Sequence, residues 1–154
     1  MAAGTRALLQ VLIVEDDLGD VALMESAFAE HSIPSNLHHV LDGGGALEFL
    51  RRSGPYADAP RPDLILLDLN MPRVDGRQAL LEIKSDETLR SIPTIVFTTS
   101  SSDSDVLASY RAKANAYVTK PINLDEYESV VMEIRNFFGH TARLPRRAGD
   151  EPAT

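Results

Sequence analysis

The sequence predicts an α/β protein built on an open, doubly wound parallel sheet of five strands, accompanied by five helices. Three short, continuous apolar runs favour this class, because strands covered by helices on both faces carry apolar side chains on both sides. Segments with helical periodicity separate these runs. A strand–helix alternation repeated five times calls for parallel strands joined by helical crossovers.

The expected strands differ in how clearly the sequence marks them. Acidic residues or prolines flank the three strong runs, and two weaker apolar runs complete the set. Strands of four to eight residues are the usual length for such runs. In chain order we expect strands at residues 8–14, 37–41, 64–67, 94–97 and 116–119.

Apolar residues at helical spacing mark the five expected helices. The last is the most clearly amphipathic, with an apolar residue on one face in each of four turns. The helix beginning near residue 103 has only a weak pattern, and either Ser102 or Asp103 can cap it, while Asn123 can cap the last one. The expected helices lie at residues 21–28, 46–50, 76–83, 106–110 and 124–138.

Two segments fall outside this pattern. Residues 51–61 contain a glycine and two prolines, which favour an extended loop before the third strand. Residues 140–154 have little to bury and are expected to form a mobile C-terminal tail. We therefore predict one domain over residues 8–139, followed by the tail and no output domain.

Composition limits the possible functions. The 154 residues include 15 basic and 23 acidic residues, a formal net charge of −8. Sequence-independent binding of nucleic acid needs a basic face that displaces counterions, so direct DNA binding is not expected. The chain has no cysteine, which excludes disulfides and thiolate chemistry. No stretch resembles a membrane span or a signal peptide, so we expect a cytoplasmic protein.

Residues suited to phosphoryl transfer follow four of the expected strands. The carboxyl ends of parallel strands meet at one edge of a doubly wound sheet, where ligands bind. Carboxylates that converge there repel one another unless a cation neutralises them, and Mg²⁺ is the natural candidate. The residues concerned are Glu15, Asp16 and Asp17 after the first strand, Asp68 and Asn70 after the third, Thr98 at the fourth, and Lys120 after the fifth.

These residue types suggest a specific chemistry. With Mg²⁺ bound, Asp68 is a carboxylate nucleophile able to form an acyl phosphate. The Thr98 hydroxyl and the Lys120 ammonium would contact the phosphoryl oxygens, and the backbone carbonyl of Asn70 would add a metal ligand. Each residue alone has a simpler explanation, such as an acidic residue that caps a helix. Their occurrence together, in the right chain order, favours the phosphoryl-transfer site.

The chain strongly resembles the receiver domain of bacterial two-component response regulators, which has a flavodoxin-like fold of the chemotaxis type. The segments VLIVEDD, LILLDLNMPRVDG, IPTIVFTTS and AYVTKPI carry the resemblance. It implies a strand order of 2-1-3-4-5, a Mg²⁺-dependent phosphoacceptor protein rather than an enzyme, and a Lys120–Pro121 peptide bond of a kind that is often cis. It assigns Glu15, Asp16, Asp68 and Asn70 to the metal, Asp68 to the phosphoryl group, Lys120 to an invariant position, and Thr98 and Tyr117 to the conformational switch.

A narrower resemblance concerns partners. The segments GPYADAPRPDLILLDLN and FTTSSSDSDVLASYRAKANAYVTKPINLDEY resemble single-domain regulators that work with phytochrome-type histidine kinases. This likeness implies phosphorylation by a sensor histidine kinase, possible homodimerisation through the C-terminal face, and an unidentified downstream protein. The signal would leave through the face formed by the fourth helix, the fifth strand and the fifth helix.

Three alternatives are weaker. A phosphatase or phosphotransferase with an aspartate nucleophile usually has a second acid two residues later, where this chain has Asn70. A receiver-like interaction domain without the chemistry would not need Asp16, Asp68, Thr98 and Lys120. Nucleotide binding is disfavoured because residues 42–45, Asp-Gly-Gly-Gly, lack both the P-loop lysine and the dinucleotide glycine spacing.

Overall fold

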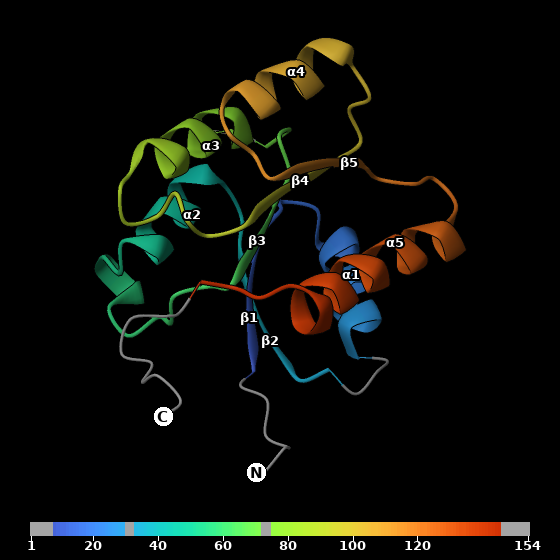
Figure 1. Ribbon diagram of the computed structural model, residues 1–154, viewed down its shortest axis with the longest axis horizontal. Coiled ribbons are helices and arrows are strands. Elements are labelled where there is room, and N and C mark those ends of the chain that lie inside the picture. Colours follow the sequence, from blue (N-terminus) through green and yellow to red (C-terminus); the bar gives the residue numbers. More distant parts are fainter. Residues whose placement is uncertain (1–7, 30–32, 72–74, 146–154) are drawn as a thin grey trace.

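A computed structural model describes residues 8–29, 33–71 and 75–145. Its five strands form one parallel sheet in the order β2-β1-β3-β4-β5, which confirms the predicted fold and strand order. The helices lie on both faces of this sheet: α1 and α5 cover one face, α2 and α3 cover the other, and α4 stands beyond α3 next to β5 (Figure 1). None of the helices in these ranges is long and apolar enough to cross a membrane.

The strands agree with the predicted apolar runs to within two residues at their ends. The largest difference is β2, which begins two residues earlier than its apolar pattern because Ser35 pairs with Leu9 of β1. The strands are β1 (Leu9–Val14), β2 (Ser35–Val40), β3 (Leu64–Leu67), β4 (Thr94–Thr98) and β5 (Ala116–Thr119).

Three of the helices begin three residues before their apolar patterns, the other two begin with them, and polar caps start most of the five. Asp42, Asp75, Ser102 and Asn123 each accept a hydrogen bond from the backbone N–H three residues later. Ser102 rather than Asp103 therefore caps the fourth helix. The helices are α1 (Leu18–Ala29), α2 (Gly43–Leu50), α3 (Gly76–Ser85), α4 (Asp103–Arg111) and α5 (Leu124–Asn136), and a 3-10 turn (Gly54–Tyr56) lies in the predicted 51–61 loop.

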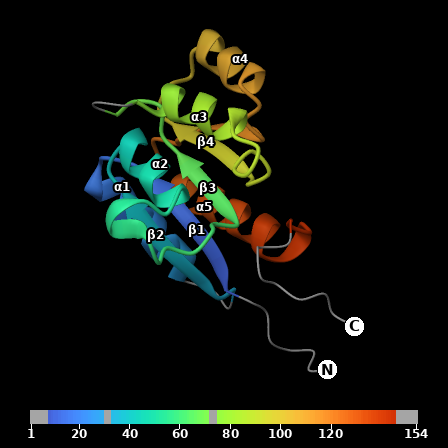
Figure 2. The same cartoon turned by 90° about the vertical axis from the view of Figure 1, so that its left-hand side faces the viewer.

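The core has two halves, one on each face of the sheet. Figure 2 shows α2 and α3 in front of the strands and α5 behind them. Alternate residues of β1 point to opposite faces. Ile13 packs with Phe28 of α1 and Val131 of α5, whereas Leu12 packs in the half that contains α2 and α3. The two buried halves hold the strands rigidly, so their carboxyl ends form a fixed platform for a site.

The structure differs from two sequence predictions, one for the Lys120–Pro121 bond after β5 and one for the C-terminal tail. The Lys120–Pro121 bond is trans, since no cis peptide bond occurs in the part of the chain that the structure describes; the trans form is also the more stable one for most X–Pro bonds. A π-helical turn (Phe137–Thr141) continues α5. Leu144, within the predicted 140–154 tail, packs against the core. Residues 146–154, and residues 72–74 of the motif LILLDLNMPRVDG, lie outside the described ranges.

Candidate functional site

The carboxyl ends of β1 and β3 bring three carboxylates together. Val14 and Leu67 end these neighbouring parallel strands and are register partners, so Glu15 and Asp68 follow them side by side. One carboxylate oxygen from each of Glu15, Asp16 and Asp68 lies within 4.8 Å of the others. Glu15 and Asp68 are buried and Asp16 is exposed, so the cluster opens to solvent on the Asp16 side.

The turn after Asp68 is held in place by a close approach of α3. A Cβ atom at Gly76, the first residue of α3, would lie 2.0 Å from the backbone oxygen of Asp68. Only glycine allows the backbone to pass this near. The N–H of Gly76 donates to the carbonyl of Leu69 at 3.2 Å, which closes the loop between β3 and α3. Asp68 therefore projects from a rigid turn.

Lys120 reaches this cluster from the end of β5. Its Nζ donates a hydrogen bond to Glu15 Oε1, and it lies 2.8 Å from Asp20 Oδ2 and 3.5 Å from Asp68 Oδ2. The side chain is almost fully buried. Its ammonium also lies 5.9 Å from the ring centroid of Phe97, which is within the range of a cation–π contact.

The charges in the pocket do not balance. Burial raises the pKa of Glu15 to about 8, with Asp68 acting in the same direction and Lys120 against both. Burial would lower the pKa of Lys120, but its hydrogen bonds to Asp20 and Glu15 outweigh burial and raise it. The site thus holds four carboxyl groups and one ammonium, and this excess of oxygen ligands fits a hard divalent cation.

Asn70 links the phosphoacceptor candidate to β4. Its backbone N–H donates to Asp68 Oδ1 at 3.2 Å, and its side-chain Nδ2 lies 3.5 Å from Thr98 Oγ1. Thr98 is fully buried at the end of β4, and its carbonyl accepts a 2.7 Å hydrogen bond from the N–H of Lys120. The four predicted positions Asp68, Asn70, Thr98 and Lys120 are therefore connected by direct contacts.

Tyr117 lies on β5, one strand further out. Its hydroxyl donates to the carbonyl of Ser100 at 2.8 Å, and its backbone N–H donates to the hydroxyl of Tyr110 at 3.1 Å. The ring is half-buried and is tied to the loop between β4 and α4. Tyr117 thus contacts the segment that follows Thr98, a place from which it can respond to movement of that segment.

The three consecutive acidic residues at positions 15–17 have two different roles, one in the pocket and one at the start of α1. Asp17 Oδ1 accepts hydrogen bonds from the N–H groups of Gly19 and Asp20, so Asp17 caps the helix. Glu15 and Asp16 instead belong to the carboxylate cluster with Asp68. The simple explanation of acidic residues as helix caps is therefore correct for one residue of three.

Several contacts at the site involve residues that sequence patterns did not indicate. Asp20 binds Lys120, 100 positions away in the chain. Arg77 donates to Asp105 from Nε at 3.1 Å and from Nη2 at 2.9 Å. Both pairs join elements that are distant in sequence, and ordinary charged residues on exposed helix turns gave no signal for them.

Comparison with protein families gives a match over most of the chain. The model described as "Response regulator receiver domain" matches residues 11–132, a range that includes every predicted site residue. Response regulator Rcp1 of Synechocystis sp. is 42% identical over 135 residues, which are 88% of this chain and 92% of that protein.

Solved structures agree with the sequence match. The phosphorylated cyanobacterial phytochrome response regulator RcpA superposes with a TM-score of 0.88 and 44% identity, over 91% of this chain and 100% of that one. The Mn(2+)-bound form of Rcp1 gives a TM-score of 0.86 with 42% identity, over 89% and 99% of the two chains. Response regulator RPA3017, in red light signaling of R. palustris, gives 0.83 with 37% identity, over 90% and 99%.

Proposed function

Because the chain belongs to the response regulator receiver domain family, a family of phosphoacceptor signalling proteins rather than enzymes in the usual sense, we propose that Asp68 is its phosphoacceptor. In this proposal a phosphoryl group passes to Asp68 from a phosphohistidine of a sensor histidine kinase or from a small acyl phosphate. The observation that carries the proposal is the placement of the buried Asp68 carboxylate near both the Lys120 ammonium and the Glu15–Asp16 pair.

The transfer can be written from the contacts of Asp68. One carboxylate oxygen attacks phosphorus, the bond from phosphorus to the donor nitrogen or oxygen breaks, and an acyl phosphate forms. Asp68 Oδ1 already accepts from the N–H of Asn70, which orients the carboxylate. Lys120, 3.5 Å from Asp68 Oδ2, is placed to pair with the incoming phosphoryl oxygens.

Mg²⁺ is the cofactor that we propose for this site. Glu15, Asp16, Asp68 and the backbone carbonyl of Asn70 would hold it, which are the oxygen ligands that Mg²⁺ prefers. When bound, the ion neutralises charge on the carboxylates and on the phosphoryl oxygens. The Mn(2+)-bound form of Rcp1, at 42% identity, supports the binding of a divalent ion by this chain.

The conformational response would begin at Thr98 and Tyr117. A phosphoryl group on Asp68 offers new acceptor oxygens to the Thr98 hydroxyl, and Tyr117 would turn inward as the loop between them moves. Such a change is a shift between two states that the new contacts favour unequally. The affected surface is the face formed by α4, β5 and α5, where we expect the unidentified downstream protein to bind.

We propose a phytochrome-type histidine kinase as the phosphoryl donor. The support is the near full-length similarity to RcpA, whose description names a phytochrome response regulator, and to RPA3017, described in red light signaling. Such a kinase uses ATP, which supports a cytoplasmic location for its regulator. A phosphorylated kinase that transfers its label to other receivers within seconds, but not to this chain, would contradict the pairing.

A homodimer through the C-terminal face is a further part of the proposal. Phe137 is 51% exposed and makes an edge-on contact with Phe138 at the end of α5, which leaves an aromatic surface beside the helix. Burying it between two copies would stabilise a dimer. Light scattering of the parent and of Phe137→Ala tests this, since the proposal predicts a dimer for the parent and a monomer for the variant.

The position of the phosphoryl group is the test of the proposed function. After incubation with acetyl phosphate and Mg²⁺, the proposal predicts a phosphoryl group on the peptide containing Asp68 and its removal by neutral hydroxylamine, which cleaves acyl phosphates but not phosphoesters. A hydroxylamine-resistant group, or a group on another peptide, contradicts the assignment. An unlabelled protein would favour a receiver-like interaction domain without the chemistry.

A further inference from the structure

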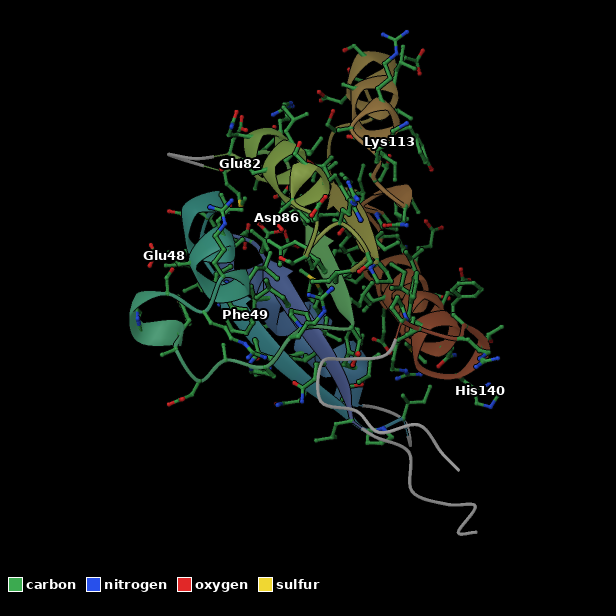
Figure 3. All side chains as sticks on the ribbon, turned by 60° about the vertical axis from the view of Figure 1, so that its left-hand side comes forward. Glu48, Phe49, Glu82, Asp86, Lys113 and His140 are labelled. Carbon is green, nitrogen blue, oxygen red and sulfur yellow. The ribbon has the colours of Figure 1, made fainter. Side chains whose placement is uncertain are left out.

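Helix α4 is attached weakly to the rest of the protein. Ser109 is its one buried residue, and its largest aliphatic side chain, Leu107, is 51% exposed. A hollow of about 410 Å³ separates it from α3, with Leu81 of α3 and Leu107 of α4 in its lining. Figure 3 shows α4, just before the labelled Lys113, standing clear of α3, where Glu82 is labelled. A helix with so little packing can shift at low cost.

One ion pair fastens the first turn of α4 to α3. Arg77 Nε donates to Asp105 Oδ1 at 3.1 Å, and Arg77 Nη2 donates to Asp105 Oδ2 at 2.9 Å. This two-pronged geometry is the strong form of an arginine–carboxylate contact. The hydrogen bond from Arg77 is the main cause that lowers the pKa of Asp105, so the carboxylate is charged at neutral pH.

The same guanidinium also holds the turn that follows the phosphoacceptor. Arg77 Nη1 lies 3.4 Å from the carbonyl of Leu69, and Nη2 lies 3.4 Å from Asn70 Oδ1. Asn70 in turn donates its backbone N–H to Asp68. An unbroken series of contacts therefore runs from Asp68 through Asn70 and Arg77 to Asp105.

A second series of contacts reaches the same carboxylate from β4. The hydroxyl of Ser100 donates to Asp105 Oδ2 at 2.6 Å, and the carbonyl of Ser100 accepts from the Tyr117 hydroxyl. Asp105 is thus the point where the turn after β3 and the loop after β4 both meet α4. Movement at either place changes the contacts of this one side chain.

We propose that Arg77 is a positioning residue that couples the state of Asp68 to α4 through its ion pair with Asp105. The inference rests on the proposed function, because it needs a phosphoryl group on Asp68. When the Asn70 turn adjusts to that group, Arg77 moves with it and the first turn of α4 follows. A lysine would keep the charge but not the fork that binds Asp105 and Asn70 together.

The test compares the exchange of backbone amide hydrogens in Asp103–Arg111 with and without acetyl phosphate and Mg²⁺. The proteins are the parent, Arg77→Gln, Arg77→Lys and Asp105→Asn. Glu82→Gln is the matched control, since it removes a surface ion pair of α3 with Arg51, 3.6 Å long, that touches neither Asn70 nor α4. Intact mass measures the phosphorylated fraction of each sample.

The proposal predicts phosphorylation of every protein and a change in α4 exchange in the parent and in Glu82→Gln. In the three coupling variants that change is smaller by at least about twofold, the low end of the effects expected for residues that transmit coupling. An undiminished change in Arg77→Gln and Asp105→Asn overturns the inference and leaves the proposed function standing. A parent that takes up no phosphoryl group overturns the proposed function itself.

Discussion

Lys120 and Asp20 form an ion pair, with Nζ and Oδ2 2.8 Å apart, at the rim of the acidic pocket. Asp68 Oδ2 is farther from the same ammonium, at 3.5 Å. The side chain of Asp20 is 22% exposed and that of Lys120 is 3% exposed, so Asp20 is the more solvent-exposed partner of the pair. Asp20 therefore competes with Asp68, and with a phosphoryl group on Asp68, for the single buried ammonium.

Replacing Asp20 should release Lys120 toward Asp68. We expect Asp20→Asn to raise the initial rate of phosphorylation by acetyl phosphate by up to about fivefold, since a partly exposed ion pair contributes about 1 kcal/mol or less. The measurement is the phosphorylated fraction against time. Glu25→Gln, an exposed carboxylate later in α1, should leave the rate unchanged; a slower Asp20→Asn protein would show that the pair holds Lys120 in its productive position instead.

Replacing Asp16 should weaken metal binding and relieve repulsion. Asp16→Asn removes one of three carboxylates whose oxygens lie within 4.8 Å. We expect Mg²⁺ affinity to fall by about tenfold or more, and the metal-free protein to become more stable because fewer like charges meet. Calorimetric Mg²⁺ titration and urea unfolding in EDTA measure the two effects. Equal Mg²⁺ affinity in parent and variant would contradict the assignment of Asp16.

A methyl group at Gly76 should disturb the phosphoacceptor turn. In Gly76→Ala the new Cβ would lie 2.0 Å from the backbone oxygen of Asp68 and 2.7 Å from Leu69 Cα. The turn must shift, at a cost of about 1–3 kcal/mol or more in the free energy of unfolding. We expect slower phosphorylation as well, because Asp68 moves with the turn. Unfolding and phosphorylation measurements that match those of the parent would refute the close approach.

Lys84 should make stability depend on pH in the alkaline range. Its Nζ donates to the carbonyls of Arg90 and Ile92 and to Asn115 Oδ1, all neutral acceptors, and burial lowers its pKa from 10.5 to about 8. Between these values the unfolded chain binds more protons than the folded one, so the free energy of unfolding rises with pH.

The matched variant for this effect is Lys84→Met, which keeps the length of the side chain without the amine. Relative to it, the parent should gain roughly 1–3 kcal/mol in the free energy of unfolding from pH 8 to 10.5. Urea unfolding of both proteins at several pH values in this window gives the difference. Parallel pH profiles of parent and variant would mean that the Lys84 amine has an ordinary pKa.

The parts of the fold that the sequence predicted best are those with the strongest burial. The apolar runs of β1, β3 and β4 lie between two helical layers, so burial alone marks them. α4 gave a weak apolar pattern because Ser109 is its only buried residue. Both Ser102 and Asp103 are residue types that cap helices, and the hydrogen bond from the Asp105 N–H to the Ser102 hydroxyl identifies Ser102 as the cap.

The site also contains residues that the sequence predicted and residues that it did not. Glu15, Asp68, Thr98 and Lys120 were predicted because each stands where a strand of the sheet ends, and the carboxyl ends of parallel strands meet at one edge. Asp20 and Arg77 were missed because their ion pairs depend on how α1, α3 and α4 are oriented, across sequence separations of 100 and 28 residues. Their side chains lie on helix turns, where a charged residue is usually solvated.

The mass of the intact protein after incubation with acetyl phosphate tests the central claim most directly. Parent and Asp68→Asn are measured with Mg²⁺ and with EDTA in its place. The proposed function predicts one added phosphoryl group in the parent with Mg²⁺, and none in the other three samples. An adduct on Asp68→Asn, or an equal adduct in EDTA, would contradict it, as would an unmodified parent under conditions that label another receiver domain.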